Sequence, residues 1–556
     1  MRTRPKHQPA QKQQVLLGAL KHAWIWRSLF SLLAGVLVYA AFPPPLSGAL
    51  PLQGSWWLAP IGVGLWGALL RGSSLVSGAV LGSCFGLGLF APLLHFAAIA
   101  MGNAVGWVAL TITELLYLTA LGLAWAAASR LKAFGAEAKW WTGLARVGAF
   151  TLLWCGVEEL RASWPLGGMP FGRLAFAAAD APMLPIAAYG GSIALTACLA
   201  CLGACLAEVM QALRVRHWPR LAPVFACGAL VVVLPSVLPL STQAQTGTLR
   251  VAAVQGNVAK DFEDAFGRAL EVTSNHLEAT RAVAQETGPG GVDVVIWPEN
   301  SADLDPRAEP RAAALVQEAA TTAGAPVLVG AIKYANDGPA GRTVRYNDLL
   351  LWDQKQGAGN YYRKHLPVPF AEYIPWRGFV RHITTEVDRI GVDLLPGTEG
   401  HTLAVPAASQ GREVPLAVGI CFEVAYDSAL RAGVLEGGEL IVVPTNNASF
   451  LLSSEAGQQL AQGRVQAVVH GRAVVQASTV GITAIINPAG QVEQATKAYT
   501  QAGLVAEVPL RSSQTWADRL GPWPGIVLEL GAAALALAGI LGATIDAVAR
   551  RRAQRR

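Results

Sequence analysis

The chain has 556 residues, which exceeds what one hydrophobic core usually organises, so we expect at least two structural units. Hydrophobic residues make up 53% of the chain and charged residues only 14%, and its mean hydropathy is +0.38, which argues against an ordinary soluble protein. We interpret the net charge of +6 at pH 7 as a membrane-topology signal and not as a nucleic-acid-binding surface.

Long uncharged runs between residues 22 and 240, and again from 524 to 547, indicate a polytopic α-helical membrane protein. A helix needs about 20 apolar residues to cross the hydrocarbon core of a bilayer. On this criterion the sequence predicts about eight transmembrane helices, at residues 28–42, 56–70, 74–100, 104–128, 143–161, 183–210, 221–240 and 524–547. Residues 246–515 have the composition of a soluble domain instead.

The placement of basic residues predicts the orientation of these helices, because short cytoplasmic loops carry an excess of Lys and Arg. Basic residues cluster at both chain ends and follow the second, fourth and sixth predicted spans, whereas the alternate short loops are uncharged. Both termini are therefore expected in the cytoplasm, and we interpret the first apolar run as an uncleaved signal-anchor. The predicted regions are a basic cytoplasmic tail (1–27), a seven-helix transmembrane domain (28–240), an extracytoplasmic domain (241–520), and a last transmembrane helix with a basic cytoplasmic tail (521–556).

Within the extracytoplasmic region, short β-branched runs alternate with helical patterns. Strands are predicted at 248–257, 291–300, 325–334, 346–354, 414–423, 439–448 and 481–490. Helices are predicted at 262–286, 307–323 and 454–472. This alternation is typical of an α/β sandwich in which helices cover the sheet faces.

Polar residues follow three of the predicted strands, at the position where an open α/β sheet usually carries its chemistry. Glu299 follows the run VVIWP, Cys421 follows LAVGI, and Asn446 follows IVVPT. A segment rich in aromatic residues and proline, 361–375, contributes Lys364 and reads as a structured loop over the strand ends.

Taken singly, each of these residues has an ordinary structural interpretation. A lone cysteine on a strand is more often a small core residue, Glu299 could close a turn, and Lys364 could be a solvated surface charge. Together, however, a carboxylate, an ammonium group and a thiol supply the base and the cation that a sulfur nucleophile needs. Cys421 is also the single cysteine of its region, and an extracytoplasmic cysteine without a partner indicates use of the free thiol.

The motifs WPE (297–299), RKHLPVPFAEYIP (363–375) and GICFE (419–423) resemble, in order and context, the Glu-Lys-Cys triad of the nitrilase superfamily, which has an αββα sandwich fold. Seven spans, a nitrilase-like domain and one more span resemble the layout of the apolipoprotein N-acyltransferases, the bacterial enzymes that finish lipoprotein maturation. The resemblance covers about residues 28 to 545. Further matching segments are VQGNV (254–258), PGTEG (396–400), PTNNASF (444–450), RVQAVVHGR (464–472), STVGITAIINPAG (478–490), WCGVEELR (154–161) and MPFGRLAF (169–176).

This resemblance implies a ping-pong acyl transfer in the inner membrane. Glu299 is expected to act as general base on Cys421, which attacks the sn-1 ester of a phospholipid, typically phosphatidylethanolamine. The resulting thioester then acylates the α-amino group of a diacylglyceryl-cysteine at the N-terminus of an apolipoprotein. Lys364, with the backbone N–H of Phe422, is expected to stabilise the oxyanion.

The resemblance also implies supporting residues and partners. Glu372 and Glu423 are expected to orient Lys364 and the base, with Asn446 in support. The partners are then a phospholipid donor, an apolipoprotein acceptor and the bilayer. No metal is expected, because the histidines of this region show no ligand spacing. No cofactor and no nucleic acid are expected either.

Residues that contact the lipid are expected in both regions. Glu158 and Arg161 lie one helical turn apart, so they either pair at a helix end or line the entrance for the acyl chain or headgroup. Glu114, near the middle of the fourth predicted span, has no obvious partner. The segments SFLLSS (449–454) and YIPWRGFV (373–380) are candidates for lipid-facing walls.

Some positions depart from the family pattern. Phe422 stands where a Tyr is frequent, Phe262 replaces a Trp that often follows the VQGN motif, Ser449 with Phe450 replaces Trp-Phe, and Val469 replaces a common Glu. Phe262 and Phe450 remain candidates for substrate contact.

Two other functions deserve comparison. A membrane-anchored nitrilase-like amidase would use water as the second acceptor, but a tether needs only one helix. A transporter or receptor with a ligand-binding domain would not need an intact triad.

Overall fold

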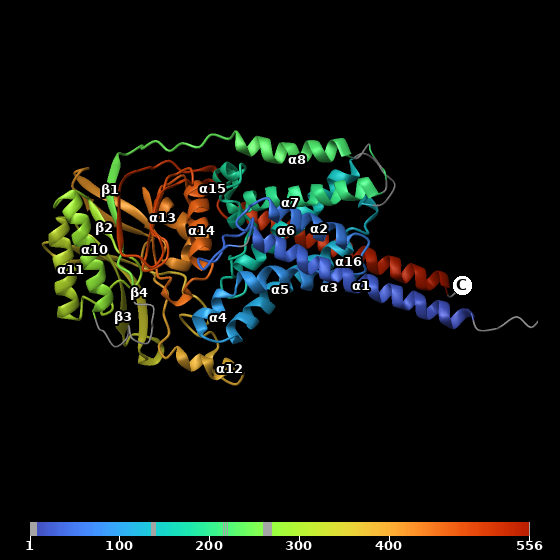
Figure 1. Cartoon of the computed structure of the whole chain (residues 1–556), viewed down its shortest axis with the longest axis horizontal. Helices are drawn as coiled ribbons and strands as arrows, with labels where there is room; N and C mark the ends of the chain where they lie inside the picture. Colours follow the sequence, from blue (N-terminus) through green and yellow to red (C-terminus); the bar gives the residue numbers. More distant parts are fainter. Residues whose placement is uncertain are drawn as a thin grey trace, which may run out of the picture.

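The structure is a computed structural model, and it describes residues 8–49, 51–134, 141–214, 216, 218, 221–258 and 270–554. It divides into a helical region and an α/β domain that lie side by side along the long axis of the molecule (Figure 1). The helical region comprises the helices before residue 240 and the last helix, so that the α/β domain is inserted between them.

Each of the eight predicted spans contains a helix. These helices are α1 (Gln8–Ala40), α2 (Leu58–Leu70), α3 (Leu75–Leu93), α5 (Val105–Ala128), α6 (Thr142–Ser163), α7 (Ala187–Arg214), α8 (Leu221–Ser236) and α16 (Trp523–Gln554). Four stretches of the described residues are long and apolar enough to cross a membrane, namely Leu75–Leu93, Val105–Ala128, Leu184–Arg214 and Trp523–Ile545. Trp24–Ala40, Leu58–Leu70 and Leu221–Ser236 are apolar but shorter.

Two predicted spans are interrupted. In the span predicted at 74–100, α3 ends at Leu93 and a separate short helix, α4 (Phe96–Met101), follows. In the span predicted at 183–210, Gly190 and Gly191 break the helix, and Gly191 has a φ of 76° that favours glycine.

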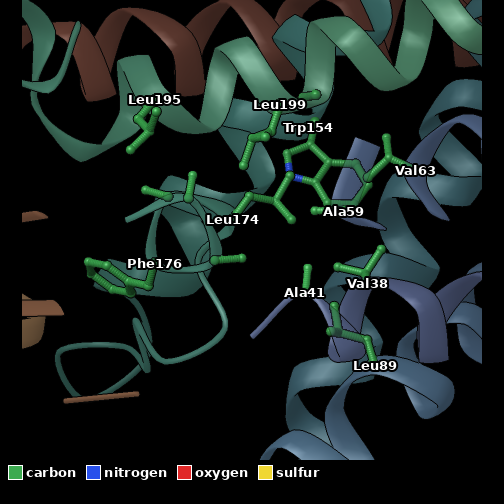
Figure 2. Close-up of a cluster of buried hydrophobic side chains, with 14 of the residues drawn as sticks. Val38, Ala41, Ala59, Val63, Leu89, Trp154, Leu174, Phe176, Leu195 and Leu199 are labelled. Carbon is green, nitrogen blue, oxygen red and sulfur yellow. The ribbon is translucent and has the colours of Figure 1, made fainter. Parts of the chain in front are cut away.

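Small residues allow the helices of this region to pack closely. A Cβ atom added to Gly78 of α3 would lie 2.5 Å from the backbone oxygen of Gly122 on α5, so only glycine permits this approach. Figure 2 shows part of the apolar core, where Trp154 and Leu174 lie among buried apolar side chains from other parts of the helical region. The other labelled residues are Val38, Ala41, Ala59, Val63, Leu89, Phe176, Leu195 and Leu199.

The α/β domain contains two six-stranded sheets. The first has the order β12 (Ala502–Pro509), β1 (Thr248–Gln255), β2 (Val294–Ile296), β3 (Val327–Ala335), β4 (Val344–Asp353), β5 (Gly357–Arg363). The second has the order β11 (Val492–Ala495), β10 (Ala484–Ile486), β9 (Val474–Ser478), β8 (Leu440–Thr445), β7 (Arg412–Val418), β6 (Thr402–Ala407). Strands β1, β2 and β3 are parallel, as are β7, β8 and β9, so their carboxyl ends lie at one edge of each sheet.

The two sheets pack face to face, and helices cover the outer face of each. Buried aliphatic side chains such as Val251, Leu328, Leu416 and Val475 fill the space between the sheets. Helices α10 (Glu271–Thr287) and α11 (Pro310–Ala323) cover the first sheet, and α13 (Asp427–Leu435) and α14 (Glu455–His470) cover the second. The predicted αββα sandwich is therefore confirmed.

Helix α14 lies between the second sheet and the helical region (Figure 1). Its residues Val465, Val468 and Val469 belong to the apolar core of the helical region, so Val469 has a packing contact in place of the expected carboxylate. Polar contacts also join the two parts: the hydroxyl of Tyr426 donates to the carbonyl of Gly168 at 3.0 Å. These contacts bring the carboxyl ends of β7 and β8 close to the helical region.

Candidate active site

Cys421 lies on a sharp turn after β7. The predicted strand at 414–423 is too long, because β7 ends at Val418 and residues 421–425 form a 3₁₀ turn. Cys421 has a φ of 53°, a backbone conformation that is strained for a residue other than glycine. Strain of this kind is typical of functional positions, and here the turn carries the thiol out of the sheet.

Glu299 follows β2 and is 95% buried, with 5% of its surface exposed. Its Oε1 accepts a hydrogen bond from the side-chain amide of Asn347 at 2.7 Å, and its Oε2 accepts one from the backbone N–H of Asn446 at 2.9 Å. The carboxylate is therefore held from both sides. Asn446, predicted as a supporting residue, contacts Glu299 through its backbone and not through its side chain.

Lys364 directly follows β5, and its side chain is buried. The Nζ atom lies 2.7 Å from Oε1 of Glu372 and 3.6 Å from Oε1 of Glu299. The other oxygen of Glu372 accepts a hydrogen bond from the backbone N–H of Val368 at 2.7 Å. Glu372 thus fixes the position of the ammonium group beside Glu299.

The three predicted triad residues form one electrostatic unit. Burial raises the pKa of Glu299, while the charge of Lys364 and a hydrogen bond with Cys421 oppose this shift. Burial alone would lower the pKa of Lys364, but the carboxylates of Glu372 and Glu299 outweigh it and raise that pKa. Burial and the charge of Glu299 raise the pKa of the Cys421 thiol, which Lys364 partly counteracts. The shifts at Cys421 and Lys364 favour an uncharged thiol beside a charged ammonium group.

Glu423 holds the backbone of the site. Its Oε1 accepts from the N–H groups of His365 and Leu366 at 2.7 and 2.9 Å, and its Oε2 accepts from the N–H of Ile420 at 2.7 Å and the hydroxyl of Tyr362 at 2.9 Å. Because these donors flank Lys364 and Cys421, Glu423 joins the two segments that carry these residues.

The aromatic residues around the turn connect it to the helical region. The ring of Phe422 stacks on that of Phe171, with centroids 5.7 Å apart and an interplanar angle of 10°. Phe96 contacts both Phe171 and Phe450, at centroid distances of 5.5 and 5.6 Å. Phe422 and Phe450 therefore belong to one aromatic wall that the two parts of the molecule share, while Ser449 is exposed. Phe262 lies outside the described residues.

Glu158 and Arg161 do not pair with each other. Glu158 accepts hydrogen bonds from the indole N–H of Trp154, the backbone N–H of Leu174 and the hydroxyl of Thr196. Arg161 pairs with Glu114 at 2.7 Å, which gives Glu114 the partner that the sequence did not indicate. Glu158 and Arg161 line a small pocket inside the helical region, together with Leu89, Phe90, Leu118, Trp154, Val157 and Gly172.

Five buried polar residues around Glu299 and the thiol received no role from the sequence, although Asn447 follows Asn446 at a strand end. These are Asn347, which donates to Glu299, and Thr445, Asn447, Glu455 and Gln459. A signal was present for two of them, because Glu455, Gln459, Gln462 and Gln466 recur at intervals of four, three and four residues. This spacing predicts a polar stripe along one face of the helix at 454–472.

Comparison with known proteins agrees with this arrangement. The α/β domain matches the carbon-nitrogen hydrolase family over residues 250–518. The helical region matches the apolipoprotein N-acyltransferase N-terminal domain over residues 34–205. The fold and the site therefore define a carbon-nitrogen hydrolase domain inserted into a membrane-type helical domain.

Relatives named apolipoprotein N-acyltransferase match nearly the whole chain. The protein from Mycolicibacterium smegmatis is 33% identical, over 91% of this chain and 84% of its own length. The protein from Azotobacter vinelandii is 28% identical, over 90% of this chain and 94% of its own. This chain belongs to the apolipoprotein N-acyltransferase family. It is accordingly an acyltransferase and a bacterial membrane protein.

Proposed function

We propose that this chain transfers a fatty acyl chain from a phospholipid to the N-terminal diacylglyceryl-cysteine of apolipoproteins, through a thioester on Cys421. The observation that carries the proposal is the convergence of three side chains: the buried ammonium group of Lys364 lies 3.6 Å from the carboxylate of Glu299, and the charges of both residues act on the thiol of Cys421. The membership of the family supplies the substrate classes.

The first half-reaction forms the thioester. Glu299 takes the proton of the Cys421 thiol while the sulfur attacks the ester carbonyl carbon of the phospholipid, and the carbonyl electrons move onto oxygen. Lys364 and the backbone N–H of Phe422 stabilise this oxyanion, and one such donor is typically worth about 3 kcal/mol. The oxyanion then collapses, the glycerol oxygen leaves with the proton from Glu299, and a lysophospholipid is released.

The second half-reaction uses the same groups. The α-amino group of the acceptor attacks the thioester carbonyl and loses a proton to Glu299, and the thiolate of Cys421 leaves. The thiolate then recovers a proton from Glu299, which restores the resting site. Since Glu299 receives a proton in both half-reactions, its buried position between two fixed donors suits a base that returns each proton.

The membrane topology is also part of the proposal. We place all eight helices across the inner membrane, both termini in the cytoplasm and the α/β domain on the periplasmic face. Helix α6 is the difficult case, because it contains four charged residues. Their charges are paired: Arg146 with Glu208, Arg161 with Glu114, and Glu159 with Arg173, while Glu158 has three donors. Pairing of this kind permits charged residues within a membrane span.

Exposed apolar side chains support the position of the site at the bilayer surface. Trp376 and Phe379 of the segment 373–380 are each 68% exposed, and Leu451 and Leu452 are also exposed. We propose that these side chains lie among lipid headgroups, where apolar residues of interfacial segments are stabilised. The aromatic wall of Phe171, Phe422, Phe96 and Phe450 then receives the acyl chain beside the thiol.

The test is acyl transfer from a phospholipid with a radiolabelled fatty acid to a diacylated lipopeptide, by the full-length protein in detergent. We expect Cys421→Ala to abolish labelling of the lipopeptide, whereas Cys227→Ala, a change of a thiol in α8, retains it. Full activity of Cys421→Ala would exclude the proposed mechanism. Release of labelled free fatty acid in place of labelled lipopeptide would identify water as the acceptor and exclude the proposed transfer.

A further inference from the structure

A series of hydrogen bonds between side chains outside the triad ends at the sulfur of Cys421. We call this series the hydrogen-bond chain. The backbone N–H of Gly481 donates to Oγ of Ser478 at 2.8 Å, and the Ser478 hydroxyl donates to Oδ1 of Asn447. The Asn447 amide donates to Oε1 of Gln459 at 2.8 Å, and Nε2 of Gln459 lies 3.7 Å from Sγ of Cys421. This distance is within the range of hydrogen bonds to sulfur.

The hydrogen-bond chain determines whether the oxygen or the NH₂ group of the Gln459 amide faces the sulfur. The backbone N–H of Gly481 can only donate, so Ser478 accepts there and its own proton is available for Asn447. Asn447 then directs its NH₂ group at Oε2 of Glu455 and at Oε1 of Gln459. The hydroxyl of Thr445 also donates to Oε1 of Gln459, at 2.8 Å. With two donors on its oxygen, Gln459 must turn its NH₂ group toward Cys421.

The residues of this chain are held rigidly. All four residues of the hydrogen-bond chain are fully buried, namely Ser478, Asn447, Thr445 and Gln459. Each of their side chains has a hydrogen bond with at least one of the others. Reversal of any amide would leave buried donors facing donors, which is costly in a buried site. The donor at the sulfur is therefore in place before the reaction begins.

We propose that Gln459 is a further catalytic residue, whose side-chain amide donates a hydrogen bond to Sγ of Cys421 and stabilises the thiolate. Gln459 transfers no proton: the thiol proton goes to Glu299, and the amide only stabilises the negative charge left on sulfur. The same hydrogen bond is available when the thiolate leaves the thioester, so Gln459 serves both half-reactions. The role in acyl transfer rests on the proposed function, but stabilisation of the thiolate does not.

Other charged groups also act on this sulfur, and the test must keep them constant. Glu299 follows β2, Lys364 follows β5, and Glu455 lies on α14. The negative charges of Glu299 and Glu455 disfavour the thiolate, whereas Lys364 favours it. Substitutions of Gln459 leave these three residues in place. The hydroxyl of Thr445 also acts on the thiol, and Gln459→Glu retains an acceptor for this hydroxyl, so the comparison of the two Gln459 variants separates loss of the amide from release of Thr445.

The test is the rate of alkylation of Cys421 by iodoacetamide as a function of pH, in the full-length protein in detergent. Peptide mass spectrometry separates Cys421 from the other six cysteines. The main variant is Gln459→Glu, which retains an acceptor oxygen for Thr445 and Asn447 but faces the sulfur without the amide donor. A second variant, Gln459→Leu, removes the donor without adding charge. The control is Gln458→Leu, whose native side chain instead donates to the carbonyl of Leu93 and to Ser454.

We expect Gln459→Leu to slow alkylation at pH 8 about tenfold and to move the pH profile about one unit higher, and Gln459→Glu to have a larger effect. Gln458→Leu should retain the wild-type profile. A wild-type profile for either Gln459 variant, with an unchanged unfolding temperature, would overturn the proposal. If the wild type forms no acyl adduct but the alkylation profiles still shift, the proposed function fails and the role of Gln459 stands.

Discussion

Buried carboxylates occur in both parts of this protein, but their surroundings differ. In the helical region, Glu208 accepts two hydrogen bonds from Arg146 and pairs with Arg71, and Glu114 pairs with Arg161. In the α/β domain, Glu299 has two fixed amide donors, but it also lies against a thiol and 3.6 Å from an ammonium group. A carboxylate that is fully ion-paired with arginine stabilises the fold. A carboxylate placed beside a thiol can instead accept the proton of that thiol and act as a base.

The same contrast exists within the α/β domain. Glu423 accepts hydrogen bonds from three backbone N–H groups and the hydroxyl of Tyr362, none of which transfers a proton in the proposed mechanism. Glu299 instead lies beside Lys364, and its charge acts on the thiol of Cys421, the proposed nucleophile. Burial alone therefore does not distinguish the two roles, and the identity of the donors does.

The largest expected effect is the loss of the base. Glu299→Gln should lower the rate of thioester formation by roughly 10²–10⁴-fold, because the amide cannot accept the thiol proton. The measurement is the appearance of acyl-enzyme by intact-mass spectrometry. Glu208→Gln is the comparison, and it should lower the unfolding temperature without changing the rate per folded molecule. Equal losses of rate in both variants would mean that the two regions do not differ as described.

The next effect concerns the charge pair of the helical region. Arg161→Met should destabilise the protein by about 3–5 kcal/mol, because it leaves Glu114 buried without its partner. The double variant Glu114→Gln, Arg161→Met should recover part of this loss, which thermal unfolding in detergent can measure. A rise in the KM for phospholipid without a change in stability would instead assign Arg161 to substrate binding.

A smaller effect is a change of pH dependence. Burial, together with the charge of Glu299, raises the pKa of Glu455 to about 8. Below this pH Glu455 is neutral, and above it the new negative charge disfavours the thiolate of Cys421, so the wild-type acylation rate should stop rising. In Glu455→Gln the rate should continue to rise and exceed the wild-type rate about tenfold at pH 9. Superimposable pH profiles would show that Glu455 does not act on the thiol.

The smallest effect is expected at Phe422. Phe422→Tyr retains the ring that stacks on Phe171, so the rate of acyl transfer should stay within about twofold of the wild type. Phe422→Ala removes the ring and should lower the rate more. A large gain of activity in Phe422→Tyr would show that a hydroxyl group at this position takes part in catalysis.

Much of the fold was predictable from the sequence. The eight apolar segments contain helices, and each of the seven predicted strands contains a strand, because burial on both faces leaves a continuous apolar run. Strands β5, β6, β9, β11 and β12 were missed. Strands β5, β6, β11 and β12 are partly exposed and therefore have no such run, and β9 is buried but contains Gln476 and Ser478. The break at Gly190 and Gly191 was also missed, because hydropathy does not depend on backbone conformation.

The triad was predictable because each member follows a strand or lies in a distinctive motif. The pairing of Glu114 with Arg161 was not, because the two residues lie 47 positions apart on different helices. The hydrogen-bond chain through Asn447 and Gln459 was equally hidden, since its direction depends on contacts between segments that only the fold brings together. Sequence reasoning therefore located the three side chains that the fold brings together, but not the polar groups that surround them.

The most direct test of the account is the intact mass of the full-length protein after incubation with phospholipid and no acceptor. We predict a mass increase of one fatty acyl unit, located on Cys421, that hydroxylamine removes and that Cys421→Ala does not show. Absence of any adduct with all phospholipids tested, or an adduct that persists in Cys421→Ala, would contradict the account.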